Sequence, residues 1–352
     1  ATMEIFSREI VATESCNNCH NRLAEHGGRR FETGYCVTCH NPGSTDQDSG
    51  NTVDFKVMIH KIHMGEDLPS VGAGTPYVIY GFRESDHDYS HVVFPQDVRN
   101  CRTCHDENDA ATPDAGNWLA NPTREACGSC HDNVNFETGE DHSGANLAAT
   151  NADCTLCHGP DGFVGGIDEV HALLAQEAAG RFQFNVVDVV DTAPGDFPTV
   201  TFSVTDPTNN DEPYDIQNDA PFTQGSGASR VAIDLGWSTT DYSNTGSGSE
   251  VPGFRPGSPA QMVSLNPLFG GSTDNEDGTF SITSGVALPL DVTGSGLVAI
   301  EGHPAEDLDG NGSQDRIPVG GAVDFFSITD SSPVPRRQVV DLENCLNCHE
   351  QL

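Results

Sequence analysis

The sequence predicts a module of short helices and loops, followed by an all-β antiparallel barrel or sandwich domain. Two observations predict this division. Five of the six Cys-x-x-Cys-His motifs fall before residue 159, in turn-rich sequence that favours little sheet. From residue 182 onward, short segments alternate apolar and polar residues with a period of two, separated by Gly, Asn, Asp, Ser and Pro, which is typical of antiparallel strands.

The six motifs together use all twelve cysteines. Numbered in chain order as motifs 1 to 6, they are Cys16/Cys19/His20, Cys36/Cys39/His40, Cys101/Cys104/His105, Cys127/Cys130/His131, Cys154/Cys157/His158 and Cys345/Cys348/His349. This spacing is typical of c-type haem attachment, in which two thiols bind the porphyrin and the adjacent His becomes the proximal iron ligand. Zinc sites and disulfides are the alternatives for paired cysteines. A chance His would follow a given Cys-x-x-Cys only about once in 25 tries, so six covalently bound c-type haems are predicted.

The first module, residues 1–171, is therefore predicted to be a multihaem cytochrome c module whose haems supply much of the apolar core. Residues 53–63 are its best helix candidate, expected to end at Gly65. The β domain is expected over residues 172–335 as a barrel or sandwich. Its strands are expected at residues 182–190, 199–205, 230–237, 279–283, 296–302 and 322–328, with a long Gly-, Ser- and Pro-rich loop at 238–259.

A C-terminal segment, residues 336–352, carries the sixth motif and repeats the start of the chain. Residues 337–349 align with residues 8–20 without a gap. Outside the motif, Arg337 matches Arg8, and Glu343 matches Glu14. The chain is therefore expected to contain one full unit, a haem module plus a β module, and the opening of a second.

Eight histidines outside the motifs are candidates for the distal side of the irons: His26, His60, His63, His87, His91, His142, His171 and His303. Eight candidates for six irons allow bis-His coordination throughout, which closes each iron to substrate and suits electron transfer. His60 and His63 share one helical face and are expected to reach two neighbouring irons. His87, His91 and His303 are less certain, because a surface position explains His303 better and one of the other two equally well.

An acidic loop near the end of the β domain is a candidate calcium site. Asp307, Asp309, Asn311 and Asp315 have the oxygen spacing of a calcium loop. Pro318 stands where such a loop has its bidentate Glu, so an Asp- and Gly-rich β-turn is the alternative. The sequence shows no Ser/His/Asp triad, Walker loop or dinucleotide fingerprint, so no catalytic residues are predicted.

The charge balance is strongly acidic, with 53 Asp and Glu against 16 Lys and Arg. Such a surface disfavours nucleic acid and anionic lipid and favours cationic or metal-ion partners, although adaptation to high salt explains it equally well. No apolar run is long enough to span a bilayer. No leader precedes Ala1, so a trimmed terminus is expected. Covalent haem attachment occurs outside the cytoplasm, so an extracellular or outer-membrane location is expected, with the periplasm as the fallback.

The first module also contains a specific combination of short motifs. These are Cys16-Asn-Asn-Cys-His20 followed by His26-Gly-Gly-Arg, Cys36-Val-Thr-Cys-His40-Asn-Pro, Met58-Ile-His-Lys-Ile-His63 with Gly65, Phe94-Pro95, and Gly139-Glu-Asp-His142. Over about residues 8–171 the sequence resembles the OmcA/MtrC family of outer-membrane and extracellular multihaem c-type cytochromes. The resemblance implies electron export to minerals, soluble metals, shuttles or other cells, with other multihaem cytochromes among the redox partners. It also implies bis-His ligation, with His26, His60, His63, His142 and His171 as distal ligands.

Members of that family usually carry more haems, on two pentahaem domains. Either the sequence is a fragment, or copies join head to tail, as in cytochrome nanowire filaments, with the sixth haem stacked on the first haem of the next copy. In the second case the distal ligand of the His349 haem is expected from the neighbouring chain, or from His303, His87 or His91.

The leading functional prediction is an electron carrier rather than an enzyme. The alternative is a multihaem reductase with one open iron for nitrite, hydroxylamine or a metal oxyanion. The surplus of histidines and the absence of a Cys-x-x-Cys-Lys variant argue against it. A binding role of the β domain, for mineral, partner or neighbouring subunit, is compatible with either prediction.

Overall fold

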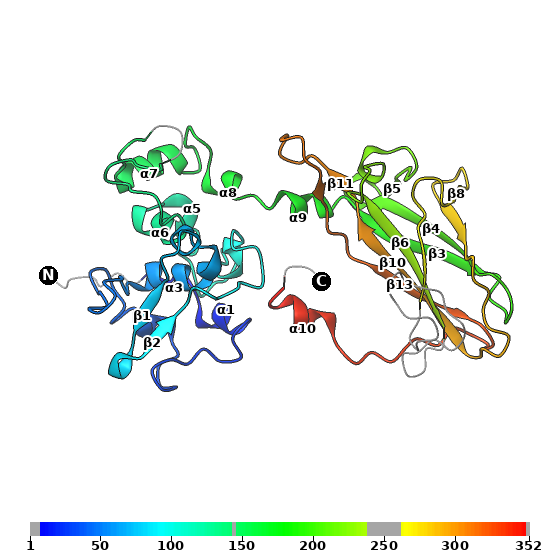
Figure 1. The fold of residues 1–352 in the computed structure, drawn as a ribbon, viewed down its shortest axis with the longest axis horizontal. Coiled ribbons are helices and arrows are strands. Elements are labelled where there is room, and N and C mark those ends of the chain that lie inside the picture. The colour runs from blue at the N-terminus through cyan, green and yellow to red at the C-terminus, as the bar shows by residue number, and fades with distance from the viewer. Residues whose placement is uncertain (1–7, 143–145, 238–261, 350–352) are drawn as a thin grey trace. The chain divides into compact units, whose positions relative to one another are not determined.

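The computed structural model describes residues 8–142, 146–237 and 262–349 (Figure 1). The chain divides into two compact units, which we call the haem-motif unit (Ala1–Ala172 with Leu342–Glu350) and the β unit (Leu173–Asp341 with Gln351–Leu352). The sixth motif, expected in a segment of its own, thus groups with the other five. The loop predicted at 238–259 lies outside the described residues. None of the helices in the described ranges combines the length and the apolar stretch that a membrane span requires.

The haem-motif unit consists of short helices joined by turns, with one small hairpin. Its α-helices are α1 Thr13–Asn17, α2 Thr33–Cys36, α3 Phe55–Met64, α4 Pro69–Gly72, α5 Asn117–Ala120, α6 Arg124–Cys130, α7 Asn151–His158, α8 Ile167–Val170 and α10 Leu342–Leu346. Its 3-10 helices are η1 Gly65–Asp67, η2 Phe82–Glu84 and η3 Cys101–Thr103, and the hairpin pairs β1 Val78–Tyr80 with β2 Asp86–Asp88.

Helix α3 is the longest helix described in this unit, and it is the one expected from the sequence. It begins at Phe55 rather than residue 53 because the Asp54 side chain caps it, accepting a hydrogen bond from the Lys56 amide at 3.3 Å. It ends where Gly65 turns to φ 48°. A Cβ at Gly65 would collide with the carbonyl of Val92, so this stop requires glycine.

The β unit is built from two antiparallel sheets that share one core. The described strands are β3 Gln183–Val190, β4 Thr199–Asp206, β5 Glu212–Pro213, β6 Arg230–Trp237, β7 Val263–Leu265, β8 Thr273–Asp274, β9 Phe280–Thr283, β10 Ser295–His303, β11 Ala305–Glu306, β12 Asp315–Arg316 and β13 Ala322–Ser327. Helix α9 Leu174–Ala179 and the 3-10 helices η4 Pro207–Asn209 and η5 Ala220–Phe222 complete it.

The pairing of these strands is that of a sandwich. One sheet has the order β13-β10-β6-β7, and the other has β3-β4-β9-β8 with β5 on β4, while β11 and β12 pair only with each other. All six strands predicted from the sequence are confirmed within one or two residues. The described pairings leave both sheets open, so a sandwich is confirmed and a closed barrel is not.

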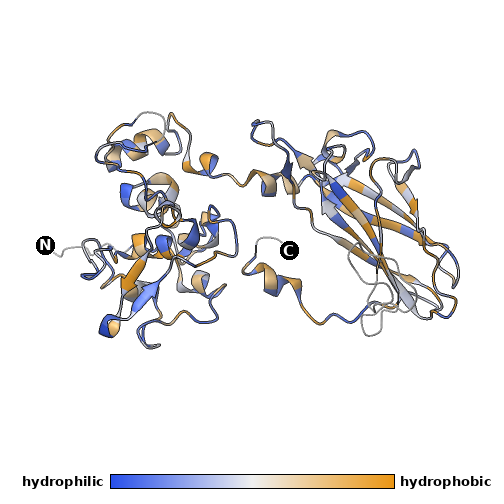
Figure 2. Cartoon of the chain, in the orientation of Figure 1, coloured by the Kyte–Doolittle hydropathy of each residue, from blue (hydrophilic) through white to orange (hydrophobic). Residues whose placement is uncertain are grey.

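The two units differ sharply in how much apolar core their own side chains provide. In the β unit, residues from both sheets, such as Phe202, Ile233 and Ile300, are fully buried in one cluster. Hydrophobic residues recur along these strands (Figure 2). Among the described residues of the haem-motif unit, the buried hydrophobics are Val57, Leu68, Tyr77, Ala115, Ala149 and Cys154. So small a core cannot by itself hold a unit of this size, which indicates that another apolar group fills it.

Candidate functional site

Each motif is wound into a single helical turn that gathers its three functional side chains. In motifs 1 to 4 and 6, the amide of the His donates to the carbonyl of the first Cys, at 2.9–3.0 Å. In motif 5 the same residues lie in α7. Residues three and four apart share one helical face, so both thiols and the imidazole project to one side. This is the arrangement that covalent haem attachment and proximal ligation require.

Five of the motif histidines each face one histidine from outside the motifs. The ring centres lie 6.0 Å apart for His20 and His63, 5.9 Å for His40 and His26, 6.1 Å for His105 and His60, 6.1 Å for His131 and His171, and 6.4 Å for His158 and His142. The five partners are the five distal candidates that the family resemblance indicated.

These separations suit one metal ion between two imidazoles. A histidine nitrogen lies about 2 Å from a metal that it binds, and the ring centre about 1 Å further away, so two rings on opposite sides have centres roughly 6 Å apart. Ordinary packing of histidine side chains gives no reason for the same ring distance to recur from pair to pair. Its recurrence in five pairs is the strongest geometric feature of the unit.

Hydrogen bonds fix the tautomer of four of these histidines. Nδ1 of His40, His63 and His171 lies 2.9 Å from the carbonyl of Val53, Ile59 and Ile167 respectively, and Nδ1 of His142 lies 3.0 Å from that of Leu147. Because a carbonyl only accepts, each Nδ1 carries the proton and donates it. Nε2 then keeps its lone pair for a metal, and the ring orientation is set.

Tight turns place those partner histidines that do not lie on a helix. His26 itself has φ 54°, and Gly27 and Gly28 follow at 77° and 76°. This left-handed run closes the turn that joins Glu25 to Arg30, whose amide and carbonyl bond at 2.8 Å. Such conformations are costly for a residue other than Gly, and they persist where the surroundings require them. Here the result is that His26 faces His40.

Burial favours the neutral, metal-binding form of several of these rings. Burial, together with the neighbouring His60, lowers the pKa of His105 to about 4. The pKa values of His60, His63, His131 and His158 are also lowered, in each case chiefly by burial. A neutral imidazole is the state that binds a metal.

The surroundings of the motifs fit haem rather than zinc or disulfides. All twelve cysteines are free thiols. No cluster of three or more His, Cys, Asp or Glu side chains suited to a metal ion occurs among the described residues. Apolar side chains stay exposed beside motif 5, including Leu156 at 63% and Phe163 at 74%. Together with the sparse core, these exposed side chains leave apolar surface that a porphyrin would cover.

The thiols also show which motifs are neighbours. Burial and the nearby Cys16 and Cys19 raise the pKa of Cys104 to about 11, so motif 3 lies beside motif 1. Burial and the nearby Cys154 raise the pKa of Cys127 to about 11, so motif 4 lies beside motif 5. The pKa of Cys130 is raised chiefly by burial and also by the nearby Cys101, so motif 4 lies beside motif 3 as well.

Motifs 2 and 6 both lie beside motif 1. Cys36 contributes to the raised pKa of Cys16, after burial. The Cys19 thiol lies 3.5 Å from the carbonyl of Asn347, and the Cys348 thiol 3.6 Å from that of Asn18. The motifs therefore follow the order 6–1–3–4–5, with motif 2 as a branch from motif 1. The head-to-tail hypothesis placed a contact of motifs 6 and 1 between two chains, whereas here the contact lies within one chain.

Cys39, the second cysteine of motif 2, is less enclosed than a haem-filled core predicts. It is the one cysteine of the twelve that is exposed, and its thiol lies 3.8 Å from the Thr38 hydroxyl. Cys157 of motif 5 is half-buried, as most of the other cysteines are, and its carbonyl accepts the amide of Val164 at 3.2 Å. Motif 2 is the branch of the order, so fewer neighbouring motifs cover Cys39. The role of all twelve cysteines in haem attachment stays a prediction, which rests on the helical turn of each motif and not on burial.

The three less certain distal candidates take other positions. In the described part of the chain, none of them is in ring contact with a motif histidine. His87 lies in the exposed strand β2, 3.2 Å from the Ser85 hydroxyl, and stacks on Tyr89. His91 is exposed, and His303 ends strand β10 in the β unit. His349 likewise has no second imidazole in ring contact among the described residues.

The loop proposed for calcium is organised by its own backbone. The Asp309 carboxylate accepts the Asn311 amide at 3.0 Å, and the Asp307 carboxylate accepts the Gly312 amide at 2.9 Å. Asp315 accepts the Leu308 amide at 3.2 Å. These bonds are those of an Asp- and Gly-rich turn, the alternative to a calcium site.

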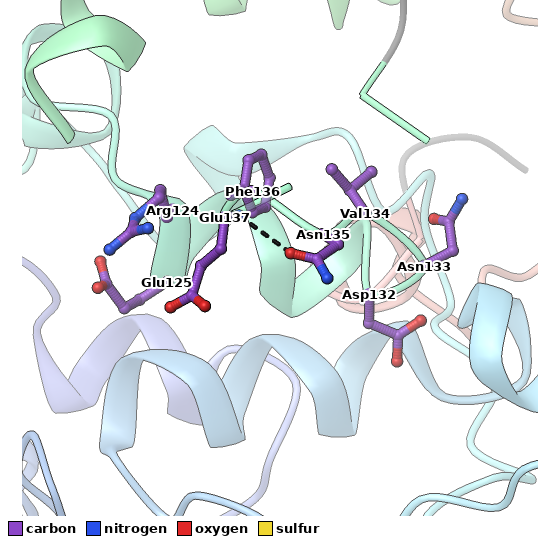
Figure 3. A pocket seen from close by; sticks show the side chains of 8 residues that line it. All are labelled: Arg124, Glu125, Asp132, Asn133, Val134, Asn135, Phe136 and Glu137. Carbon is purple, nitrogen blue, oxygen red and sulfur yellow. Dashed lines mark hydrogen bonds between the residues drawn. The ribbon is translucent and has the colours of Figure 1, made fainter. Parts of the chain in front are cut away.

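A cavity of about 430 Å³ opens beside motif 4 (Figure 3). Its lining consists of Arg124, Glu125, Asp132, Asn133, Val134, Asn135, Phe136 and Glu137. The lining is mainly charged and amide side chains, with Asn135 accepting the Glu137 amide at 3.0 Å. No motif histidine lines it.

Comparison with known proteins identifies the haem-motif unit. Residues 8–172 match the family model for outer membrane cytochrome MtrC/MtrF-like, domains II/IV. Residues 8–172 are thus similar in sequence to outer-membrane multihaem cytochromes of the OmcA/MtrC family. Over 158 residues it is 36% identical to the multihaem cytochrome MtrC of Shewanella baltica, an alignment that covers 44% of this chain and 19% of that protein.

Two solved structures of this family share the fold. The crystal structure of the outer membrane decahaem cytochrome OmcA matches with a TM-score of 0.71 and 24% identity, over 100% of this chain and 52% of that chain. The crystal structure of MtrC from Shewanella baltica matches with a TM-score of 0.66 and 23% identity, over 99% of this chain and 51% of that chain. The chain thus spans about half the length of the solved structures it matches.

Proposed function

We propose that the chain carries single electrons through covalently bound haems, as part of extracellular electron transfer at the outer-membrane surface. The observation that carries this proposal is the set of five histidine pairs with ring centres 5.9–6.4 Å apart. Haem bound at these pairs would supply reversible one-electron oxidation and reduction of its iron. With histidine on both sides, each such iron is closed to substrate.

The chain's own residues have three tasks in this proposal. The cysteines would fix each haem in place, and each histidine pair would bind its iron from both sides. The compact order 6–1–3–4–5 keeps neighbouring motifs close enough for their thiols to interact, which favours a continuous route for electrons. The acidic surface, with a net charge of −37, suits cationic or metal-ion acceptors.

The sixth haem is proposed to lie beside the haem of motif 1. Its neighbour is motif 1 of the same chain, so the relay is proposed first for a single chain. Its distal ligand is proposed to come from a neighbouring copy or from His303, His87 or His91. Light scattering of the holoprotein tests the head-to-tail assembly: a concentration-dependent mass above one chain supports it, and a constant monomer mass contradicts it.

The experiment that tests the function is carbon monoxide binding to the fully reduced holoprotein. Intact mass first establishes the number of haems. The electron-carrier proposal then predicts that the haems of motifs 1 to 5 bind no carbon monoxide, while the protein reduces a soluble ferric chelate reversibly. Any binding that remains should disappear when Cys345 and Cys348 are both replaced by Ala. Binding that survives this change, together with turnover of nitrite or hydroxylamine, would instead establish the reductase.

A further inference from the structure

Helix α3 carries both lysines of the sequence, and each reaches a carboxylate at one end of α6. Lys61 Nζ lies 2.5 Å from Asp132, with side chains 17% and 6% exposed. Lys56 Nζ lies 3.9 Å from Glu125, with side chains 39% and 45% exposed. In Figure 3 the carboxylate of Asp132 points toward the pale blue helix below it. Both ion pairs join α3 to α6, but their side chains differ in exposure. The Lys61–Asp132 pair is mostly buried, and the Lys56–Glu125 pair is exposed.

Each member of the buried pair is also held by a second interaction. Asp132 accepts hydrogen bonds from the amide and the hydroxyl of Ser70, at 2.9 and 2.6 Å. The Lys61 ammonium lies over the ring of Tyr77, 5.2 Å from its centre, and Tyr77 is only 3% exposed. A cation over an aromatic face is stabilised there. When one of the two charges is removed by substitution, the side chain that carries the other charge is therefore still held in position.

The buried pair lies among the motifs at the middle of the relay. Asp132 directly follows His131, and Lys61 lies between His60 and His63. The carboxylate of the pair thus belongs to the residue directly after the motif 4 histidine, and the ion pair holds the Lys61 ammonium beside it.

A structural role alone does not account for this pair. Removing two charges from water costs free energy that their attraction does not always recover, and apolar side chains would join α3 to α6 as well. A buried charge, however, acts strongly on a nearby redox centre because little water screens it. A carboxylate stabilises the oxidised, more positive iron, and an ammonium opposes it.

We infer that the Lys61–Asp132 ion pair sets the reduction potential of the haem attached at motif 4. On reduction that iron gains one electron and loses one unit of positive charge, so each member of the pair shifts the equilibrium in an opposite direction. This inference rests on the proposed haem attachment and ligation.

The test is a spectroelectrochemical titration of the holoprotein in a chain carrying His171→Met. Methionine ligation raises a haem's potential, so the motif 4 haem titrates apart from the others. In this background, Lys61→Gln is expected to lower its potential, and Asp132→Asn to raise it. The double variant should return toward the parent value. Lys56→Gln is the matched control and should leave the potential unchanged, because its ion pair is exposed.

Three results would overturn the inference: no shift, a shift of the same sign in both single variants, or an equal shift in Lys56→Gln. If His171→Met does not fold, the same series in the natural chain must move one macroscopic potential in opposite directions. Peptide mass keeps the two proposals apart. A motif 4 peptide without haem contradicts the proposed function, whereas a full haem complement with unmoved potentials contradicts only the role of the ion pair.

Discussion

His60 and His63 are three residues apart on one helix, yet they face histidines of different motifs. His60 faces His105 of motif 3, and His63 faces His20 of motif 1. One helical turn therefore serves two neighbouring centres, and any change in the helix register would disturb both. The spacing of the two residues predicted two targets, but nothing in the sequence indicated which motifs these were.

A change at His63 tests its proposed role as a distal ligand. His63→Ala is expected to open one iron, giving a high-spin signal from a single haem in the electron paramagnetic resonance spectrum. His63→Met should keep that iron six-coordinate and raise its potential. His87→Ala is the matched control, because His87 lies in an exposed strand and faces no motif histidine. A high-spin signal of equal size in His87→Ala would contradict the assignment.

The buried histidines also predict how stability depends on pH. The pKa of His105 is lowered from 6.5 to about 4, chiefly by burial. Between these values the unfolded chain binds a proton that the folded chain does not, so stability falls as the pH drops through this window. Iron bound by His105 would hold the ring in the same proton-free form, so the direction of this pH dependence is the same with haem attached.

The measurement is the free energy of unfolding at pH 7 and at intermediate pH values down to about 4. The carboxylates lose their stabilising contribution at lower pH than the histidines do, so the two effects can be told apart. The pKa of Asp132 is below its ordinary value because hydrogen bonds from Lys61 and Ser70 outweigh its burial. Its stabilising contribution is therefore present above an ordinary Asp pKa of about 3.9 and is lost only at lower pH. An unfolding free energy that stays constant between pH 7 and about 4 would contradict the burial of the histidines.

At the scale of single elements, α3 depends on its glycine stop. Gly65→Ala is expected to destabilise the haem-motif unit by about 1–3 kcal/mol, because the backbone is left-handed there and a Cβ meets Val92. Gly74→Ala is the control, since Gly74 has φ 88° but nothing within 4 Å of a Cβ. Denaturant titration should show the larger loss for Gly65→Ala. Equal losses would mean that the contact with Val92 has no effect.

The elements themselves could largely be predicted from the sequence, for physical reasons. Alternation of apolar and polar residues located β4, β6 and β10 because one face of each strand packs into the core shared by the sheets. Short strands such as β5 and β8 have two residues each, too few for any periodicity to show. Whether the sheets close into a barrel depends on pairings between distant strands, which local pattern does not contain.

At the scale of the whole molecule, the two units have separate sources of stability. The β unit has its own core, in which Phe202 is fully buried. Phe202→Ala is expected to destabilise the β unit by about 3–5 kcal/mol while the low-spin haem spectrum is retained. Val323→Ala is the control, since Val323 is 59% exposed and should change stability by no more than about 0.5 kcal/mol. Loss of the haem spectrum with Phe202→Ala would show that one core serves both units.

The candidate site was predictable in its parts but not in its assembly. The attachment residues follow from local spacing, because a single turn brings Cys, Cys and His together. The partner of each motif histidine does not, because pairs such as His20 and His63 are joined only by the fold. The order of the motifs and the Lys61–Asp132 pair depend on the packing of α3 and α6 in the same way.

The most direct test of the five histidine pairs is a structure of the holoprotein, by cryo-electron microscopy or crystallography, at a resolution that shows the iron ligands. The account predicts five irons, each bound by one pair: His20 with His63, His40 with His26, His105 with His60, His131 with His171, and His158 with His142. An iron of motifs 1 to 5 that is open on its distal side, or bound there by any other residue, would contradict it.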